Sequence, residues 1–211
     1  DSYPLPRLDQ CIDALGEDNA WFSCLDMRSS YHQVAMDEKD AEKTAFICHR
    51  GSFLYNTMPM GLRNSGATFQ RLMDMVMAGL TFEVCLVYLD DIVVFSKTLE
   101  EHLQRLEMVL QRLVDTGLKL KPSKCRMLQR RIVFLGHVVT EDGVSTDPAK
   151  TEQISKWPRP NSFRELRGFL GLCGYYRKFI DRYAEIAAPL TSMLKKGHRF
   201  SWSDEAETAF E

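Results

Sequence analysis

The sequence lacks the features that mark membrane, secreted disulfide-rich and repeat proteins. No apolar run approaches the ~20 residues that a membrane-spanning helix needs, and no signal peptide opens the chain. Its six cysteines lie far apart without a Cys-x-x-Cys pair, which argues against a structural zinc and for reduced thiols in an intracellular protein. Internal repeats and low-complexity segments are also missing. The 211 residues, 45% apolar and 27% charged, therefore indicate one large or two small globular domains.

Acidic residues are missing from one particular stretch, between Asp115 and Glu141. The basic residues of that stretch are Lys119, Lys121, Lys124, Arg126, Arg130 and Arg131. A second basic cluster, diluted only by Glu165, comprises Lys156, Arg159, Arg164, Arg167, Arg177 and Lys178. Either cluster is a solvated face or a track for a phosphate backbone, which needs fixed positive charge. The net charge of −2 favours a basic groove beside an acidic centre over a surface that binds nucleic acid everywhere.

Hydrophobic spacing predicts an α+β fold, with strands and helices mixed up to about residue 146 and helices afterwards. A short helix is expected from Leu8 to Leu15, ended by Gly16, and a longer Met-rich helix after the loop 58–66. Thr98 and Glu101 form a capping box at the start of another helix, which stops at Gly117. Strands are expected at 21–25, 34–36, 44–48, 52–55, 84–89, 92–95, 132–135 and 138–139.

Two aspartates stand between two of these apolar runs. Asp90 and Asp91 are expected to form the two-residue tip of a β-hairpin. Hairpin tips favour Asn-Gly or Asp-Gly because tight turns need positive φ, and two adjacent carboxylates also repel. The pair is therefore either a solvated turn or part of a cation site. Asp26, at the end of the expected strand 21–25, supplies a third carboxylate if the strands are neighbours, and the set would then suit two-Mg²⁺ nucleotidyl transfer on a nucleic acid.

Several motifs extend this hypothesis. They are Phe-Ser-Cys-Leu-Asp-Met-Arg-Ser-Ser-Tyr-His-Gln at 22–33, Met-Pro-Met-Gly-Leu through Ala-Thr-Phe-Gln at 58–70, Tyr-Leu-Asp-Asp at 88–91, Phe-Leu-Gly-His-Val-Val at 134–139, and the segment 166–179. In this order, over nearly the whole chain, they resemble the reverse transcriptase of gypsy-type (Metaviridae) LTR retrotransposons. The resemblance implies a right-hand polymerase palm with partial fingers, its mixed antiparallel sheet packed on helices. It assigns 1–140 to fingers and palm, 141–198 to a thumb- or connection-like helical segment, and 199–211 to the start of an RNase H-like domain.

The resemblance also implies roles for individual residues. Asp26 and Asp90 would hold two Mg²⁺ ions, with Mn²⁺ as an alternative, helped by the backbone carbonyl of Met27, and Asp91 would complete the triad. Tyr31 would be the steric gate that excludes a ribose 2′-hydroxyl, although the sequence without the family makes it a core or turn aromatic. The remaining nucleotide-binding residues would be Arg28, Ser29, Ser30, Met60, Gly61, Gln70 and Lys124. The primer grip would consist of Leu135, Gly136 and His137.

The chain departs from the family pattern in places. Ser30 stands where the family commonly has glycine, and Gly66 where proline is more frequent. Since proline pre-sets φ at a helix start, Gly66 is expected to raise the cost of ordering that turn by up to about 1 kcal/mol. Lys121 is a near neighbour of Lys124, so either lysine could protonate the pyrophosphate or be a solvated charge. The chain is expected to start after the basic fingers strands and to be an internal piece of a pol polyprotein or a decayed copy.

The leading hypothesis is a fragment of an RNA-directed DNA polymerase that adds dNTPs to a primer 3′-hydroxyl on an RNA or DNA template. Its expected partners are the RNase H and integrase of the same polyprotein, with no membrane, and its expected location is a cytoplasmic virus-like particle or the nucleus. One alternative is a non-catalytic nucleic-acid-binding remnant. A second is a metal-dependent phosphodiesterase, since two-ion chemistry also serves nucleases.

Overall fold

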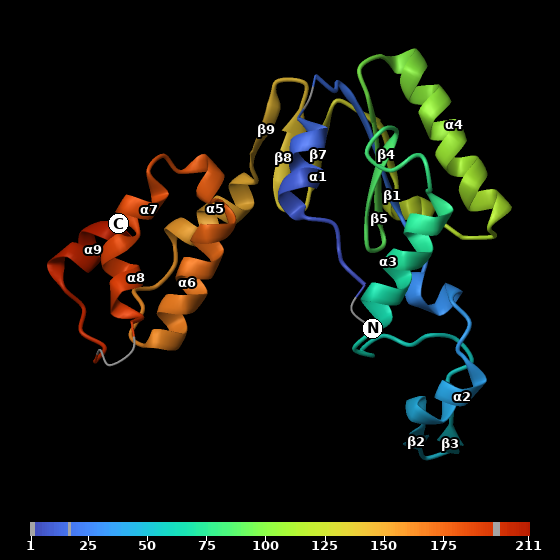
Figure 1. Cartoon of the computed structure of the whole chain (residues 1–211), viewed down its shortest axis with the longest axis horizontal. Coiled ribbons are helices and arrows are strands. Elements are labelled where there is room, and N and C mark those ends of the chain that lie inside the picture. Colours follow the sequence, from blue (N-terminus) through green and yellow to red (C-terminus); the bar gives the residue numbers. More distant parts are fainter. Residues whose placement is uncertain (1–2, 17, 196–198) are drawn as a thin grey trace. The chain divides into compact units, whose positions relative to one another are not determined.

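A computed structural model describes residues 3–16, 18–195 and 199–211 (Figure 1). The chain forms two compact units, the first made of Asp1–Leu135 and Val139–Val144, and the second of Gly136–Val138 and Ser145–Glu211. The predicted boundary between residues 198 and 199 falls next to residues 196–198, which lie outside the described residues. The three segments expected from the family resemblance, 1–140, 141–198 and 199–211, stay predictions. Within the described ranges, no helix is both long enough and apolar enough to cross a membrane.

The first unit is built on a sheet with the strand order β4-β5-β1-β6. Its strands are β4 (Cys85–Tyr88), β5 (Asp91–Ser96), β1 (Trp21–Asp26) and β6 (Arg126–Gln129). Each neighbouring pair is antiparallel. Alternate residues of the inner strands belong to two different hydrophobic clusters, one on each face of the sheet. Leu25 and Ile92 belong to one cluster, and Phe22 and Val93 belong to the other. The continuous apolar runs in the sequence therefore reflect strands that are buried on both faces.

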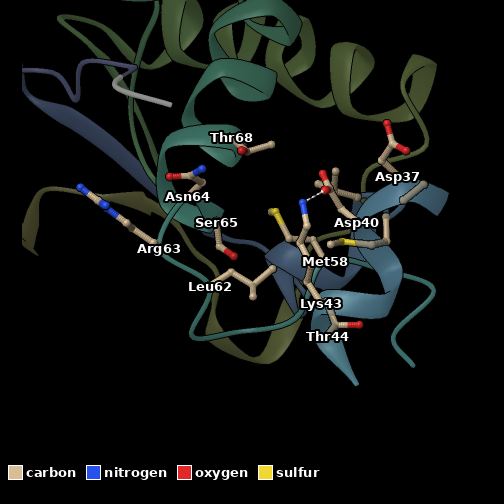
Figure 2. A pocket seen from close by; sticks show the side chains of 13 residues that line it. Asp37, Asp40, Lys43, Thr44, Met58, Leu62, Arg63, Asn64, Ser65 and Thr68 are labelled. Atoms are coloured by element: carbon tan, nitrogen blue, oxygen red, sulfur yellow. Dashed lines mark hydrogen bonds and ion pairs between the residues drawn. The ribbon is translucent and has the colours of Figure 1, made fainter. Parts of the chain in front are cut away.

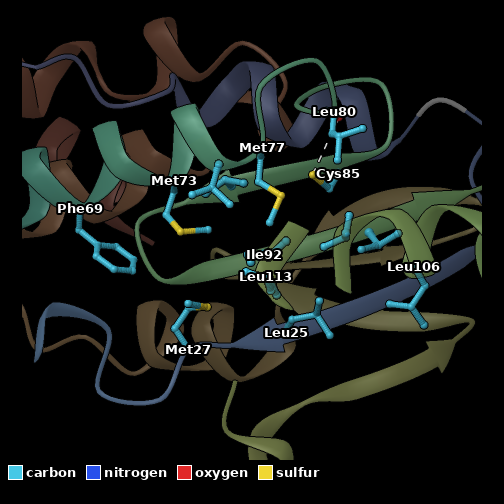
Figure 3. Close-up of a cluster of buried hydrophobic side chains, with 14 of the residues drawn as sticks. Leu25, Met27, Phe69, Met73, Met77, Leu80, Cys85, Ile92, Leu106 and Leu113 are labelled. Carbon is cyan, nitrogen blue, oxygen red and sulfur yellow. Dashed lines mark hydrogen bonds between the residues drawn. The ribbon is translucent and has the colours of Figure 1, made fainter. Parts of the chain in front are cut away.

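Helices α3 (Ser65–Val76) and α4 (Leu99–Asp115) pack on one face of this sheet. Figure 3 shows the cluster there, where the expected Met-rich helix face meets the strands. The buried members labelled in it are Leu25, Met27, Phe69, Met73, Met77, Leu80, Cys85, Ile92, Leu106 and Leu113. Helix α1 (Leu8–Leu15) packs on the other face, and Gly16 ends it as predicted. The Thr98 cap of α4 is also confirmed, because its Oγ1 accepts a hydrogen bond from the Glu101 amide at 3.3 Å.

A buried polar network ties α4 to the sheet. His102, 0% exposed, hydrogen-bonds Ser23 Oγ through Nε2 at 2.8 Å and Ser96 Oγ through Nδ1 at 3.0 Å. Ser96 Oγ also donates to the Thr98 carbonyl, and Ser23 Oγ also accepts from the Leu128 amide. The hydroxyl proton of Ser96 is thus used, so Nδ1 donates to Ser96 while Nε2 accepts from Ser23. The neutral imidazole satisfies the whole network.

This network predicts an acid-sensitive stability. Burial, and next the charge of Arg105, lower the pKa of His102 in the folded state. The unfolded chain, whose histidine pKa is about 6.5, therefore binds the proton more readily, and the free energy of unfolding falls as pH drops below that value. Urea unfolding of wild type and His102→Gln at pH 7.5 and 5.0 checks this: the wild type should lose more stability than the variant. An equal loss in both would contradict the prediction.

Between β1 and α3 lies a segment with short elements. They are η1 (Ser30–Gln33), α2 (Glu38–Ala41), η2 (Glu42–Thr44), β2 (Phe46–Cys48) and β3 (Gly51–Phe53), the last two forming a hairpin. The motif that follows Met27 forms the helical turn η1. The strand expected at 34–36 is wrong: Ala35 makes an isolated bridge to Thr57, because no continuous partner strand lies opposite it. Helix α2 was not expected, although Asp37 caps it by accepting from the Lys39 amide.

The second unit is mainly helical. Its elements are α5 (Pro148–Ser155), α6 (Phe163–Tyr175), η4 (Arg177–Phe179), α7 (Tyr183–Ile186), α8 (Ala188–Met193) and α9 (Asp204–Phe210). Asp147, Ser162 and Ser203 cap α5, α6 and α9. The buried members of its hydrophobic cluster are Leu166, Phe169, Cys173, Leu190, Met193 and Ala206. A further sheet has the order β7-β8-β9, formed by Arg131–Phe134, His137–Thr140 and Gly143–Thr146.

Candidate active site

The Asp-Asp hairpin is present, but its tip lies one residue earlier than the sequence suggested. Tyr88 and Asp91 face each other in the β4–β5 ladder, so Leu89 and Asp90 form the two-residue turn. Asp91 is the first residue of β5. Leu89 takes the left-handed conformation with φ +55°, which is uncommon for a residue other than glycine. The prediction of an Asp90-Asp91 tip is therefore wrong by one position, because no glycine marks the turn.

Asp26 lies directly opposite the hairpin. In the antiparallel β1–β5 register, its Cα partner is Asp91. Like charges facing each other across strands are destabilising unless something compensates them. Burial, followed by the charges of Asp90 and Asp26, raises the pKa of Asp91. The expectation that the strands carrying these carboxylates are neighbours in one sheet is confirmed by this register.

Lys124 supplies a positive charge to the group. Its Nζ lies 3.4 Å from Asp26 Oδ2, and it opposes the carboxylates by lowering the pKa of Asp91. It belongs to η3 (Pro122–Lys124), which follows a stretch bound along β1: the Lys121 amide donates to the Asp26 carbonyl at 2.8 Å. The structure thus brings the side chain of Lys124, rather than that of Lys121, to Asp26.

The donor set suits a divalent cation that brings ligands of its own. Among the described residues, no group of three or more His, Cys, Asp or Glu side chains could enclose a metal ion. Mg²⁺, however, is usually bound through one or two carboxylates, with waters and substrate phosphates completing the shell. Asp26 and Asp90 offer hard oxygen donors in a cluster of repelling charges, which fits that mode. Met27 has its side chain in the core, 3% exposed, so its backbone carbonyl is the group it could offer.

Residues of η1 lie beside Asp90. Ser30, 3% exposed, donates from Oγ to Asp90 Oδ2 at 3.5 Å, and Ser29 before it is left-handed with φ +48°. The Tyr31 ring packs edge-on against Phe69, with centroids 5.7 Å apart. Burial, followed by the charge of Asp90, raises the pKa of Tyr31. The predicted motif around Tyr31 therefore gathers at the carboxylates.

The other predicted nucleotide-binding residues are spread more widely. Arg28 is exposed, and its carbonyl accepts from Gln33 Nε2 at 2.7 Å. Met60 is 67% exposed, and Gly61 has φ +90°, which favours glycine. Gln70 is 0% exposed, and its Oε1 accepts from the Leu89 amide at 2.7 Å. Gln70 thus lies behind the Asp-Asp hairpin, and its predicted contact with the nucleotide stays a prediction.

A cavity of about 430 Å³ lies at the N-terminal end of α3 (Figure 2). Its lining residues are Val34, Ala35, Met36, Asp37, Asp40, Lys43, Thr44, Met58, Leu62, Arg63, Asn64, Ser65 and Thr68. Figure 2 shows Lys43 paired with Asp40 across its polar side. The cavity lining includes neither the three carboxylates nor Tyr31, so we base no active-site assignment on it.

The predicted primer-grip turn also lies one residue earlier than expected. Leu135 (φ +48°) and Gly136 (φ +72°) connect β7 to β8, and His137 begins β8. The Gly136 carbonyl accepts from Tyr176 Oη at 3.0 Å and from the Asp147 amide at 3.3 Å. His137 is 5% exposed and lies among three rings, those of Tyr175, Tyr176 and Phe179, at centroid distances of 5.4, 5.4 and 5.5 Å. No local pattern in the sequence predicts the contact between Tyr176 and Gly136.

Known proteins resemble this chain in sequence. The family model described as "Reverse transcriptase (RNA-dependent DNA polymerase)" matches residues 1–139. The Retrovirus-related Pol polyprotein from transposon 297 of Drosophila melanogaster is 47% identical over 93% of this chain, and that from transposon gypsy is 37% identical over 92%. The chain covers 18% and 19% of these two proteins. It therefore spans about a fifth of the length of the curated relatives it matches.

Solved structures agree in fold. A foamy viral protease-reverse transcriptase in complex with double-stranded DNA superposes with a TM-score of 0.82 and 25% identity, over 90% of this chain and 34% of that one. The same viral enzyme in complex with an RNA/DNA hybrid gives a TM-score of 0.82 at 23% identity. The α+β polymerase fold and the gypsy-type resemblance are thereby confirmed. The chain belongs to the reverse transcriptase (RNA-dependent DNA polymerase) family.

Proposed function

We propose that this chain forms the catalytic palm of an RNA-directed DNA polymerase that adds deoxynucleotides to a primer 3′-hydroxyl. The observation that carries the proposal is the register of the central sheet, which sets Asp26 opposite Asp91 with Asp90 in the adjoining turn. Repelling carboxylates in one place are costly to fold, and such a cost is typical of sites that hold cations. Reverse transcriptases use divalent metal ions, and this donor set is suited to them.

In the proposed mechanism, Asp26 and Asp90 would hold two Mg²⁺ ions, with Mn²⁺ as an alternative, and the Met27 carbonyl would assist. The bound ions would activate the attacking 3′-hydroxyl and stabilise the leaving oxygen. Asp91 adds negative charge behind these ligands. Lys124 Nζ, already held beside Asp26, donates a proton to the departing pyrophosphate.

Tyr31 selects the sugar in this proposal. Its ring packs edge-on against Phe69, and the charge of Asp90 is near enough to raise the pKa of its hydroxyl. In this proposal, the sugar of the incoming nucleotide would lie against this ring. Ser29 and Ser30 would also contact the nucleotide in this proposal, as would Arg28, Met60 and Gly61. The turn Leu135-Gly136-His137 contacts the primer.

The proposed partners are a primer annealed to an RNA or DNA template, dNTPs, and the RNase H and integrase of the same polyprotein. Support comes from relatives that are Pol polyproteins and from a structural neighbour that binds double-stranded DNA. The exposed basic residues of the β6 region, including Lys121 and Arg126, suit a phosphate backbone. The proposed location is a cytoplasmic virus-like particle or the nucleus.

Metal-dependent primer extension tests the proposal. The chain, alone and joined to the flanking polyprotein sequence of its element, is incubated with poly(rA)/oligo(dT), dTTP and Mg²⁺. We expect extension by the joined form that stops completely with EDTA and returns when Mg²⁺ or Mn²⁺ is added in excess. Salt-sensitive primer–template binding without any incorporation in either form would instead indicate the non-catalytic remnant.

A further inference from the structure

A chain of hydrogen bonds leads away from the catalytic turn into α3. The Leu89 amide donates to Gln70 Oε1 at 2.7 Å. Gln70 Nε2 donates to Asp74 Oδ1 at 2.9 Å, and Tyr3 Oη donates to Asp74 Oδ2 at 2.6 Å. The four residues come from the N-terminal segment, one face of α3 and the β4–β5 turn, and all lie in the first compact unit. The turn that carries Asp90 is therefore bonded indirectly to Tyr3.

This series of hydrogen bonds ends at Leu89, whose backbone conformation is strained. Leu89, with φ +55°, is in a backbone region that costs free energy for any residue with a branched or bulky side chain. Such a conformation persists when the surroundings over-determine it. The bond from the Leu89 amide to Gln70 is one of these determinants, and the next residue in the chain is Asp90. A change in this bond should move Asp90 directly.

Asp74 fixes the orientation of the Gln70 carboxamide. An amide side chain can rotate to exchange its oxygen and nitrogen, and Leu89 needs the oxygen. The carboxylate of Asp74 accepts hydrogen bonds and donates none, so it selects the orientation in which Nε2 points toward it. Nε2 lies also 3.4 Å from the Val87 carbonyl, which favours the same orientation. Since Gln70 is 0% exposed, water does not take over this role.

Tyr3 in turn holds Asp74. Its hydroxyl occupies the second carboxylate oxygen, and the hydrogen bond to Asp74 is the main cause that raises the pKa of Tyr3. The Arg71 guanidinium lies over the Tyr3 ring, 5.0 Å from its centroid, so α3 contacts both ends of the phenol. We propose that Asp74 and Tyr3 are positioning residues of the active site, acting on Asp90 through Gln70 and Leu89. The expected effect on catalysis rests on the proposed polymerase function, whereas the hydrogen bonds themselves do not depend on it.

Amide hydrogen exchange measured by NMR directly tests this hydrogen-bond relay, which runs from Tyr3 through Asp74 and Gln70 to Leu89. In Asp74→Ala, we expect the Leu89 amide to exchange about tenfold faster than in wild type, because a buried hydrogen bond is weakened. Tyr3→Phe should have a smaller effect of the same sign, and Asp74→Asn should restore most of the protection because its oxygen still accepts from Gln70. The matched control is Asp115→Ala, which removes the carboxylate from the exposed Gln111–Asp115 pair of α4, 2.7 Å long. It should leave Leu89 unchanged.

Primer extension supplies the second measurement. In the polyprotein-length protein, Asp74→Ala should lower kcat about tenfold with little change in the KM for dNTP, as expected when a reacting group is displaced. Asp74→Asn should recover most of kcat. If the Leu89 exchange rate in Asp74→Ala stays within about twofold of wild type, or changes equally in Asp115→Ala, the relay is wrong. If the wild type shows no extension at all, the proposed function fails, while the exchange rates still decide the relay.

Discussion

Replacing Asp90 with asparagine should lower Mg²⁺-dependent primer extension by about a thousandfold while leaving the protein at least as stable as wild type. The loss follows from the removal of a hard anionic donor from the proposed metal site, where a bound ion contributes several kcal/mol to the transition state. Asparagine is nearly isosteric and can still accept the bond from Ser30 Oγ, now 3.5 Å long. The geometry of the turn should therefore survive the substitution.

The stability expectation separates chemistry from folding. The charge of Asp90 is the second cause, after burial, of the raised pKa of Asp91. Removing that charge should bring the Asp91 pKa back toward its usual range and relieve repulsion in the metal-free protein. We therefore expect a Tm equal to or above that of wild type. Asp142→Asn, on an exposed turn far along the chain, serves as the control and should retain full extension.

Two outcomes would count against this account. Undiminished extension by Asp90→Asn would remove Asp90 from the metal site. A lowered Tm alongside the loss of extension would attribute the effect to the fold instead. Differential scanning fluorimetry and primer extension on the same preparations distinguish these cases, because each preparation then reports both quantities.

The sequence predicted the elements whose signals are local. Gly16 ends α1 and Thr98 caps α4, each through chemistry carried by one or two residues. The convergence of Asp26 with Asp91 could also be expected, since both lie at the end or start of strongly apolar runs. Such runs leave few ways to pair two strands that are buried on both faces.

The positions of the turns could not be predicted. Leu89 and Leu135 both have positive φ, a conformation that a leucine in the sequence does not predict. Each of the two turns therefore lies one residue earlier than predicted. Two tertiary hydrogen bonds hold these turns: the Leu89 amide donates to Gln70, and the Tyr176 hydroxyl donates to the Gly136 carbonyl. Both bonds join residues far apart in sequence. Local propensity carries no information about such bonds.

Polar core residues were missed for the same reason. His102, on a predicted amphipathic helix, gave no sign that Ser23 and Ser96 would satisfy both of its ring nitrogens. The Gln70–Asp74 pair did leave a signal, because residues four apart share a helix face. The motif resemblance predicts a nucleotide contact for Gln70 and says nothing of its spacing to Asp74.

Gly136→Ala should destabilise the second unit by about 2–3 kcal/mol. At φ +72°, an alanine costs about 1–2 kcal/mol in backbone conformation. Its Cβ would also lie 2.9 Å from Tyr176 Oη, closer than real Cβ contacts, so the Tyr176 hydroxyl must move. Moving it breaks the 3.0 Å bond to the Gly136 carbonyl, a loss of about 1 kcal/mol.

Urea unfolding followed by tryptophan fluorescence measures the loss. In a Trp21→Phe background, the remaining tryptophans, Trp157 and Trp202, both report on the second unit. Gly171→Ala, inside α6 with no heavy atom within 4 Å of the added Cβ, is the matched control and should be neutral or stabilising by up to about 1 kcal/mol.

A double-mutant cycle with Tyr176→Phe isolates the contact from the backbone. Without the hydroxyl, the added Cβ meets no oxygen at 2.9 Å, so Gly136→Ala should cost less in the Tyr176→Phe background than in the wild-type background. The remaining loss should approach the 1–2 kcal/mol expected for the left-handed backbone alone. Equal losses in the two backgrounds would show that Tyr176 does not hold this turn, and that the strain at Leu135 and Gly136 is balanced by other contacts.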